Sequence, residues 1–365
     1  MLRVGFIGLG RVGGLALRLL IEERRDLGIV AIDSADRGDL VKRLGGEIKF
    51  YRACSPAEIA EIVEGVDLVA TALPSSKAYP VIKELLERGH NIVDVSFIGF
   101  DPYIFENTCR KHRSFYIVDA GFAPGFSNLI LGHIYDRVGK LDRAAIYVGG
   151  IPLKPVPPIN YQITWSPDDL IEEYTRPARV VVGGAVKVVD PLEKILEVEI
   201  PGLGVFEGFY CDGLRTMIKN IEAEEMYEVT IRHKGHLRAI KILRDLGFLD
   251  KKTIKIDGYE VEPRRLTAKL FEEKLKQTIP DQAIIYVDVM RGDTYYRLVA
   301  RLIGDLDRPA TSYYTALIYA KTIMIALDNV IEEGVQPLEK LHHHYHDYLK
   351  YLRKHGTSIK IETNI

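Results

Sequence analysis

Three glycines near the start of the chain have the spacing of a dinucleotide-binding loop. Gly8, Gly10 and Gly13 form a G-x-G-x-x-G pattern in GLGRVG, after an apolar run and before a segment with helical spacing. In such a loop the first glycine permits a tight turn, the second lets backbone amides approach a pyrophosphate, and the third lets helix and strand pack closely. Together with Arg11 and Val12 between them, these glycines are predicted to bind the cofactor.

Asp33 stands where such proteins recognise the ribose of the cofactor. It ends the next apolar run, about twenty residues after the last glycine of the loop. A carboxylate there accepts hydrogen bonds from ribose hydroxyls and repels a 2′-phosphate, so NAD is favoured over NADP. Ser34 joins the predicted cofactor-binding residues, whereas the nearby Arg37 weakens the preference for NAD. The alternative is a doubly wound domain whose glycines serve packing alone.

Two further carboxylates end apolar runs and are candidates for proton transfer. Asp94 and Asp119 stand just before the loops SFIG and AGFAPG, and a third loop, ALPSS, follows Thr71. Because ligands bind beyond the carboxyl ends of the strands in a doubly wound sheet, these loops are expected to meet the nicotinamide end of the cofactor. A carboxylate at such a place is either an active-site group or a cap for the following loop, and both interpretations stay open.

The second half of the chain offers residues that suit an acidic substrate. Arg215, in DGLR, lies just inside a predicted helix capped by Asp212, and a guanidinium is the best bidentate partner for a carboxylate. Arg232 is a second possible anion contact. Histidine titrates near neutral pH, which suits His236 to proton transfer. Surface arginines and structural histidines are common, so the structural alternatives stay open as well.

Alternating strands and helices must position these groups. Strand-like runs separated by segments with helical spacing indicate parallel strands joined by crossover helices, which is a Rossmann-type doubly wound α/β sheet. The predicted strands span residues 2–7, 28–33, 47–51, 66–71, 91–95 and 115–119.

A second region follows, and a proline-rich stretch over 149–161 interrupts any regular pattern there. Its apolar runs predict an α+β domain with a mixed sheet, and one long buried helix is predicted over 312–334, ending at Gly334. We expect a dinucleotide-binding domain over 1–125, completed by a C-terminal helical segment over 310–355, and a second domain over 126–309. Its predicted strands are 143–148, 179–182, 195–200 and 282–290, and its predicted helices are 168–175, 236–247 and 264–276.

Size and composition exclude several classes of protein. With 365 residues the chain is too long for one small module, and 47% hydrophobic against 27% charged residues is typical of globular rather than disordered proteins. A formal net charge of −2 gives no general attraction for nucleic acid or an anionic membrane, and no apolar run is long enough to span a bilayer. We therefore predict neither nucleic-acid nor membrane partners.

Cysteine usage and the start of the chain indicate a cytoplasmic protein. The three cysteines lack any CxxC spacing, which favours a reducing compartment without disulfides or a zinc site. The opening residues do not have the pattern of a secretory leader. Scarce Asn, Gln, Cys and Met are typical of proteins from hot environments. His342 and His346 have helical spacing, but no third ligand accompanies them, so no metal site is predicted.

Five segments carry a family resemblance, namely GLGRVG at 8–13, VDAGFAPGFSNLILG at 118–132, YVGGIPLKPVPPINYQITWSPDDLIEEYTRPARV at 147–180, DGLRTM at 212–217 and GHLRAIKILRDLGF at 235–248. They make nearly the whole chain resemble the saccharopine dehydrogenase-like superfamily, and most closely its archaeal and bacterial lysine 6-dehydrogenases. The long middle block is specific, whereas the DxGxxPG and WSP elements occur more broadly, including in saccharopine reductases.

The resemblance implies a Rossmann domain completed by a returning C-terminal helix, and a mixed α/β domain that binds substrate and forms a homodimer. It implies that the glycine loop and Asp33 hold NAD, and that Arg215 contacts the substrate carboxylate, with Asp212 and Arg232 in the same substrate-binding set. It also implies that the loops after the strands line the nicotinamide and the substrate. The cofactor-lining residues in these loops would be Ala72, Leu73, Pro74, Ser96, Phe97 and Pro124.

The leading hypothesis is NAD-dependent oxidative deamination of the ε-amine of L-lysine, which yields 2-aminoadipate 6-semialdehyde and ammonia. Lysine must first lose a proton, because an ammonium nitrogen has no free lone pair, and Asp119, Asp94 or His236 could assist. One alternative is a saccharopine or carboxyspermidine-type reductase, whose larger substrates require a second basic cluster such as Arg176 and Arg179. The other alternative is a non-enzymatic NAD(H)-binding sensor.

Overall fold

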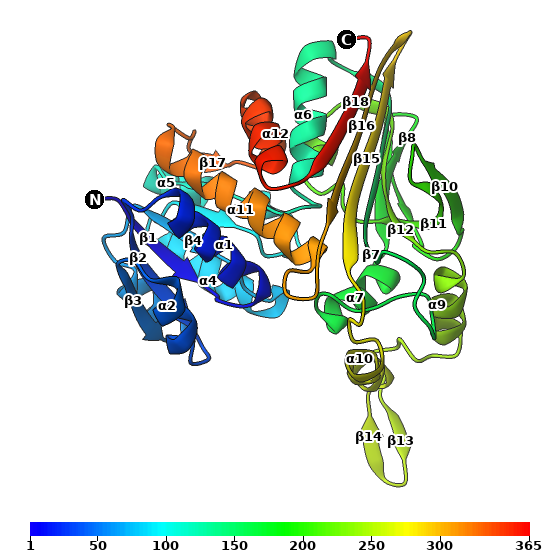
Figure 1. The fold of residues 1–365 in the computed structure, drawn as a ribbon, viewed down its shortest axis with the longest axis horizontal. Coiled ribbons are helices and arrows are strands. Elements are labelled where there is room, and N and C mark those ends of the chain that lie inside the picture. Colours follow the sequence, from blue (N-terminus) through cyan, green and yellow to red (C-terminus); the bar gives the residue numbers. More distant parts are fainter. The chain divides into compact units, whose positions relative to one another are not determined.

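Residues 1 to 365 are all described by the computed structural model, and they divide into two units (Figure 1). Unit 1 comprises Met1–His133 and Ser312–His355, and unit 2 comprises Ile134–Thr311 and Gly356–Ile365. The chain passes from one unit to the other within two helices, α6 (Phe126–Val138) and α11 (Ala310–Asp328), and once more at Gly356.

Unit 1 is built on a seven-stranded sheet in which every strand runs parallel to its neighbours. The strand order is β17-β6-β5-β4-β1-β2-β3, and the order of the first six strands is that of dinucleotide-binding sheets. The predicted doubly wound α/β fold and its six predicted strands are confirmed. The strands are β1 (Arg3–Ile7), β2 (Gly28–Asp33), β3 (Ile48–Arg52), β4 (Leu68–Thr71), β5 (Ile92–Asp94), β6 (Phe115–Ile117) and β17 (Gly334–Val335).

Helices connect these strands and pack on them through apolar faces. Helix α1 buries Ala16, Leu19 and Leu20, and α4 buries residues at the same three- and four-residue spacing, as the sequence predicts. Their side chains and those of the central strands form the core of the unit. The helices lying wholly in this unit are α1 (Arg11–Glu23), α2 (Gly38–Leu44), α3 (Pro56–Ile62), α4 (Ser75–Glu87), η1 (Pro102–Phe105), α5 (Glu106–His112), η2 (Leu338–His344) and α12 (Tyr345–Lys354).

The prediction of one helix over 312–334 is wrong at its end. Helix α11 stops at Asp328, where the side-chain amide of Asn329 donates to the carbonyl of Ile325 at 3.0 Å. Gly334 instead opens β17, which pairs with β6. The backbone at Gly334 has φ of 104°, and the Glu106 carboxylate lies where a side chain would begin and accepts a bond from the Val335 amide at 2.7 Å. Pairing with the sheet edge thus replaces the last helical turns.

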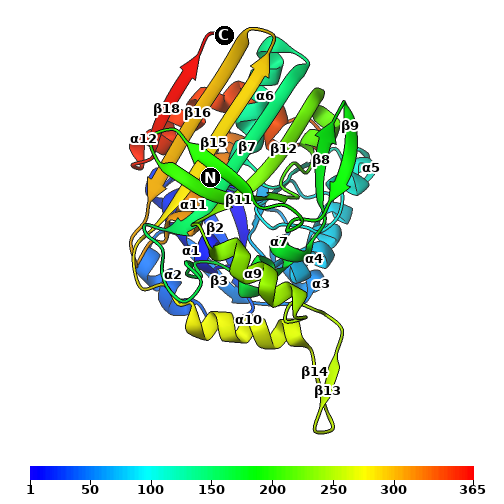
Figure 2. The ribbon, with the colours of Figure 1, turned by 90° about the vertical axis from the view of Figure 1, so that its right-hand side faces the viewer.

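Unit 2 contains a nine-stranded mixed sheet, which Figure 2 shows with its strands side by side. Strands β7 and β12 are parallel, and the other neighbours are antiparallel. All four strands predicted for this region are present, and five more were not predicted. The strands are β7 (Leu141–Pro152), β8 (Ala178–Val182), β9 (Ala185–Val189), β10 (Leu196–Ile200), β11 (Gly204–Cys211), β12 (Ala223–Arg232), β15 (Asp281–Arg291), β16 (Thr294–Ile303) and β18 (Ser358–Thr363).

The helices of unit 2 lie beside this sheet and form a core of their own. Helices α7, α9 and α10 contribute Leu170, Ile240 and Phe271 to one buried cluster, and the three helices confirm the predicted positions. A short hairpin extends from this part of the chain (Figure 2). The elements are α7 (Pro167–Thr175), α8 (Met217–Asn220), α9 (His236–Asp245), α10 (Pro263–Lys274), β13 (Ile254–Ile256) and β14 (Tyr259–Val261).

Candidate functional site

The glycine loop joins β1 to α1 and leaves its outer side open. Gly8 has φ of 92°, and a side chain there would collide with the carbonyl of Ala72, while one at Gly13 would collide with the carbonyl of Gly8. Around Gly10 no atom lies within 4 Å of the position of a Cβ. Gly10 caps α1 without a side-chain hydrogen bond, so the first amides of the helix are available to an anion. The loop therefore fits a pyrophosphate.

Asp33 lies beside this loop and is held by two backbone amides. Its Oδ2 accepts from Leu9 N at 2.7 Å and its Oδ1 from Ala35 N at 2.8 Å. A carboxylate offers about four acceptor positions, so both oxygens keep capacity for ribose hydroxyls. Arg37 Nε lies 3.7 Å from Oδ2, and the carbonyl of Ser34 accepts from Arg52 Nε at 2.9 Å. This geometry fits the ribose end of a dinucleotide.

Asp94 ties together the loops at the carboxyl ends of β4, β5 and β6. It is fully buried and accepts from Thr71 Oγ1 at 2.6 Å and from Tyr116 Oη at 3.0 Å. It also accepts from the backbone of Ser96, whose hydroxyl in turn accepts from Leu73 N at 3.0 Å. Burial raises the pKa of Asp94 to about 6 despite these bonds. The predicted cofactor-lining loops containing Ala72, Pro74 and Phe97 are thereby fixed to one carboxylate.

Asp119 begins a second tightly folded loop, which leads from β6 into α6. It is 3% exposed and has φ of 54°, a left-handed conformation that is uncommon outside glycine. A side chain at Gly125 would collide with the carbonyl of Gly121, and Gly125 N donates to Asn128 Oδ1 at 2.9 Å. Pro124 lies within the same turn, half buried. Rare backbone conformations of this kind concentrate at functional sites.

In unit 2, the predicted substrate contacts Asp212 and Arg215 lie in one turn between β11 and α8. The prediction of a helix that is capped by Asp212 and includes Arg215 is therefore wrong, because α8 begins only at Met217 and the backbone of Arg215 is left-handed. Arg215 is 5% exposed and has φ of 50°. The Asp212 carboxylate receives two bonds from the guanidinium of Arg179, Nε to Oδ1 at 2.7 Å and Nη2 to Oδ2 at 2.9 Å. The acidic side chain is therefore engaged by its own chain.

Arg232 and His236 belong to a different cluster, in which they lie close together. Arg232 is 2% exposed, donates to Tyr174 Oη at 3.1 Å and to Glu173 Oε2 at 2.8 Å, and lies 5.0 Å from the ring centre of Tyr161. A buried guanidinium needs this kind of pairing, because desolvation of an isolated charge is costly. Arg232 is thus enclosed by protein groups of unit 2.

The partners of His236 determine its protonation. Its Nδ1 lies 2.8 Å from the carbonyl of Ile159, which can only accept, so Nδ1 carries the proton. Its Nε2, 2.8 Å from Tyr174 Oη, then accepts from the phenol. Complete burial and the nearby Arg232 lower the pKa of His236 to about 3, so the ring is neutral at physiological pH.

Three side chains of these clusters were not singled out from the sequence, namely Glu173, Tyr174 and Glu228, and Arg179 was named only as part of a basic cluster for a larger substrate. Glu173, Tyr174 and Arg179 fall in the segment WSPDDLIEEYTRPARV, which carries the family resemblance, but their partners are 33 to 62 residues away. Glu228 lies on β12, a strand that was not predicted. These pairs depend on the strand register and on the packing of α7, which the sequence alone does not show.

The chain shows neither a preformed metal site nor a helix that could span a membrane. No group of three or more His, Cys, Asp or Glu residues has the geometry to hold a metal ion. His344 Nδ1 lies 3.2 Å from Asp347, and the ring of His133 stacks on Tyr345. None of the helices is long and apolar enough to cross a bilayer.

The parallel sheet, its strand order and the open glycine loop define a Rossmann-type, dinucleotide-binding class of protein. Residues 121–357 match the model of the saccharopine dehydrogenase C-terminal domain. The chain belongs to this saccharopine dehydrogenase-like family, which confirms the predicted resemblance at the level of the superfamily. The closer resemblance to lysine 6-dehydrogenases stays a prediction.

Curated relatives align with only part of this chain, and the aligned region is less than half of their own length. Mouse alpha-aminoadipic semialdehyde synthase is 25% identical over 221 residues, 57% of this chain and 24% of that protein. Saccharopine dehydrogenase [NADP(+), L-glutamate-forming] of Schizosaccharomyces pombe is 22% identical over 209 residues, 53% of this chain and 46% of that protein. The chain therefore spans less than half the length of these relatives.

A solved structure shares the fold over its whole length. Apo saccharopine dehydrogenase (L-Glu forming) from Saccharomyces cerevisiae superimposes with a TM-score of 0.78 at 18% identity, with complete coverage of both chains. The match confirms the fold class, with a parallel sheet in one unit and a mixed sheet in the other.

Proposed function

We propose that this protein is an NAD-dependent dehydrogenase that oxidises a carbon bearing an amine in a lysine-derived substrate. The specific reaction proposed is oxidative deamination of the ε-amine of L-lysine to 2-aminoadipate 6-semialdehyde and ammonia. The observation that carries the proposal is the open glycine loop with Asp33 beside it, in a chain of the saccharopine dehydrogenase-like family. In this proposal unit 1 binds the dinucleotide, and unit 2 binds the amino acid and provides the contacts of a homodimer.

The residues of the chain would share the binding and proton-transfer work. When bound, NAD supplies the acceptor for the hydride that leaves the carbon bearing the amine. The amides at the start of α1 bind the pyrophosphate, Asp33 binds the ribose, and Arg215 pairs with the substrate carboxylate. Water then hydrolyses the imine, which releases ammonia.

Among the three candidates for proton transfer, we favour Asp119. The lone pair of His236 is used by Tyr174, and Asp94 is enclosed by donors that hold two loops. Asp119, which also has an interaction within the chain, begins the loop beyond β6, at the edge of the sheet where ligands bind in this fold, and its left-handed backbone is maintained by close glycine packing. In this role it would accept a proton from the lysine ammonium before oxidation.

The preference for NAD rests on the carboxylate of Asp33. Its two amide bonds hold it in place, so it would oppose a 2′-phosphate by charge repulsion. The relative from S. pombe is named as an NADP(+) enzyme, so the proposed preference for NAD differs from that relative and is tested by comparing the two cofactors.

A second candidate function is saccharopine oxidation, favoured by the names of the relatives. The basic pair expected for a larger, more acidic substrate is already matched by carboxylates in unit 2. Arg179 pairs with Asp212, and Arg176 lies 3.9 Å from Glu172. These pairings favour the smaller substrate, lysine.

One substrate panel separates the candidates. The absorbance at 340 nm is followed with lysine, saccharopine, spermidine and carboxyspermidine, each with NAD and with NADP. Lysine turnover with NAD supports the proposal, turnover restricted to saccharopine replaces it with the second candidate, and binding of NADH without turnover of any amine favours a sensor.

The free state of all three cysteines further supports the proposed cytoplasmic location.

A further inference from the structure

The turn that carries Arg215 needs an external support. Arg215 holds a left-handed backbone conformation with φ of 50°, which is unfavourable for a residue with a long side chain relative to extended or helical backbone. Only the four-residue helix α8 follows the turn, and the end of strand β11 precedes it. The conformation therefore has to be fixed by contacts from neighbouring elements.

One support comes from strand β8. Arg179 grips the Asp212 carboxylate with both Nε and Nη2, at 2.7 and 2.9 Å, and its backbone amide adds a third bond to Oδ1 at 3.3 Å. Three bonds to one carboxylate fix both its position and its orientation. The planar, two-pronged geometry of the guanidinium is needed for this, and lysine cannot reproduce it.

A second support lies beneath the turn, on β12. The carboxylate of Glu228 is 2% exposed and occupies the space where a side chain at Gly213 would begin. Cys211, just before the turn, lies with its Sγ 3.4 Å from Glu228 Oε1. The turn is thus held by Arg179 through Asp212 and by Glu228 through its contacts with Gly213 and Cys211.

We infer that Arg179 is a positioning residue, which acts through Asp212 to hold Arg215 in the conformation that binds the substrate carboxylate. The inference rests on the proposed function for the role of Arg215. It gives Asp212 a structural part in place of direct contact with the amino acid. It also makes the Arg179 guanidinium a determinant of substrate affinity, without contact with the reacting atoms.

The test uses Arg179→Lys and Arg179→Met, with Arg176→Lys and Arg176→Met as matched controls. Arg176 lies three residues earlier and has a similar exposed side chain, 27% against 36%, but its carboxylate contact is 3.9 Å long and leads to α7. The first readout is hydrogen exchange of peptides that cover residues 211–216. The second readout is the separation of KM from kcat for lysine, with NAD affinity measured alongside.

The expected result is faster exchange over residues 211–216 in both Arg179 variants and in neither Arg176 variant. KM for lysine should rise about 10-fold or more in Arg179→Lys, while kcat and NAD affinity should stay within about 2-fold of wild type. This is expected because Arg179 supports a substrate-binding residue and does not itself contact the reacting atoms. The charge-swapped protein, in which Arg179→Asp is combined with Asp212→Arg, should restore part of the slow exchange over residues 211–216 and part of the low KM for lysine.

The outcomes distinguish the role of Arg179 in the turn from the proposed oxidation of lysine. Unchanged exchange over 211–216 would overturn the support by Arg179, whatever the activity. Faster exchange with an unchanged KM would overturn the link between the turn and substrate binding. If the wild-type protein does not oxidise lysine, the proposed function fails, while the exchange measurement still decides whether Arg179 holds the turn.

Discussion

At the scale of single residues, the side chains expected to do chemistry fall into two physical groups. Gly10 faces open space, and Asp33 keeps free acceptor capacity. Arg232, His236 and Asp94 are enclosed by partners from their own unit. Sequence reasoning selected both groups by residue type, because burial and partners depend on contacts that are distant along the chain.

Removal of the Arg215 guanidinium tests the proposed substrate contact. Arg215→Ala should lower kcat/KM for lysine by roughly 10² or more, since loss of one partner from a desolvated charge pair costs about 3 kcal/mol. Steady-state kinetics check this, with Arg238→Ala, an exposed arginine on α9, as the control. An unchanged kcat/KM in Arg215→Ala would remove this residue from the substrate site.

Replacement of Asp33 should shift the cofactor preference. Asp33→Ser removes the charge that repels a 2′-phosphate and releases Arg37, which lies 3.7 Å away, to bind one. We expect the ratio of kcat/KM for NADP to that for NAD to rise by about 10², or about 2.7 kcal/mol. Asp36→Ser is the control, because Asp36 caps its own loop through Gly38 N. An equal ratio in wild type and Asp33→Ser would show that this carboxylate does not select the cofactor.

His236 gives a pH dependence of stability with a definite sign. Its folded pKa of about 3 lies below the ordinary value of 6.5, so the unfolded chain binds the proton more readily. The stabilisation is complete above pH 6.5 and is lost as the pH falls from 6.5 towards 3, by about 1.4 kcal/mol per pH unit. The raised pKa of Asp94 acts in the opposite direction between about 6 and 3.8, so a comparison of variants is required.

That comparison measures the free energy of unfolding by denaturant titration at several pH values from 7.5 down to 4. His236→Gln should lose less stability than wild type on acidification, although it starts from a lower value at pH 7.5 because it disrupts a buried network. His346→Gln, an exposed position on α12, serves as the control. Parallel curves for wild type and His236→Gln would contradict the assignment of a neutral, buried histidine.

At the scale of elements, the parallel sheet was far easier to predict than the mixed one. The central strands of unit 1 are buried on both faces and appear as continuous apolar runs such as GIVAID. Strands β12 and β16 alternate apolar with charged residues, for example in TYYRLVARLI, because one face of the mixed sheet is only partly covered. This weaker signal explains why β12, which carries Glu228 and Arg232, was missed, and with it both polar clusters.

The glycine loop allows a matched test of space. Gly10→Ala meets no atom of the protein within 4 Å, so folding should be unaffected, with a Tm within about 2 °C of wild type. The added methyl group would occupy the approach of the pyrophosphate, and the Kd for NADH should rise at least about 10-fold. Gly14→Ala, one turn further along α1, makes ordinary contacts with Leu40 Cδ2 at 3.4 Å and the Leu9 carbonyl oxygen at 3.6 Å, and it should retain NADH affinity. Calorimetry that finds equal affinity in all three proteins would exclude this loop as the binding site.

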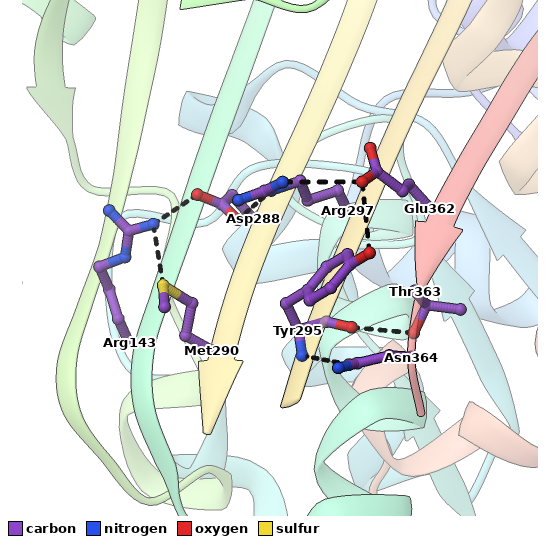
Figure 3. Close-up of polar contacts among 8 residues, drawn as sticks. All are labelled: Arg143, Asp288, Met290, Tyr295, Arg297, Glu362, Thr363 and Asn364. Carbon is purple, nitrogen blue, oxygen red and sulfur yellow. Dashed lines mark hydrogen bonds and ion pairs between the residues drawn. The ribbon is translucent and has the colours of Figure 1, made fainter. Parts of the chain in front are cut away.

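At the scale of the whole molecule, one face of the unit 2 sheet suits contact with a second copy. Tyr147, Tyr286 and Val299 lie side by side across three strands of this face, and the rings of Tyr147 and Tyr286 stack at 5.5 Å. Beside them runs a row of alternating charges, in which Arg143 pairs with Asp288, Arg297 Nε lies 3.1 Å from Asp288, and Arg297 Nη1 lies 3.8 Å from Glu362 (Figure 3). Tyrosine and arginine are enriched in protein interfaces.

The proposed homodimer can be tested through this face. Tyr147→Glu introduces a charge among the aromatic rings, and sedimentation velocity should then show a monomer where the wild-type protein sediments as a dimer. Tyr259→Glu, at a position 76% exposed on the β13–β14 hairpin, should leave the assembly unchanged. A monomeric wild-type protein, or a dimer retained in Tyr147→Glu, would exclude this face as the interface.

Strand β17 has a practical consequence for attempts to divide the protein. It adds residues 334 and 335 to the outer side of β6, so both segments of unit 1, Met1–His133 and Ser312–His355, are needed to complete the dinucleotide-binding sheet. A fragment that stops at residue 133 would leave the amides and carbonyls of β6 bare, and unprotected strand borders of this kind promote aggregation. The dinucleotide-binding unit is therefore better obtained from a gene that joins Ser312–His355 directly to Met1–His133 than by simple truncation.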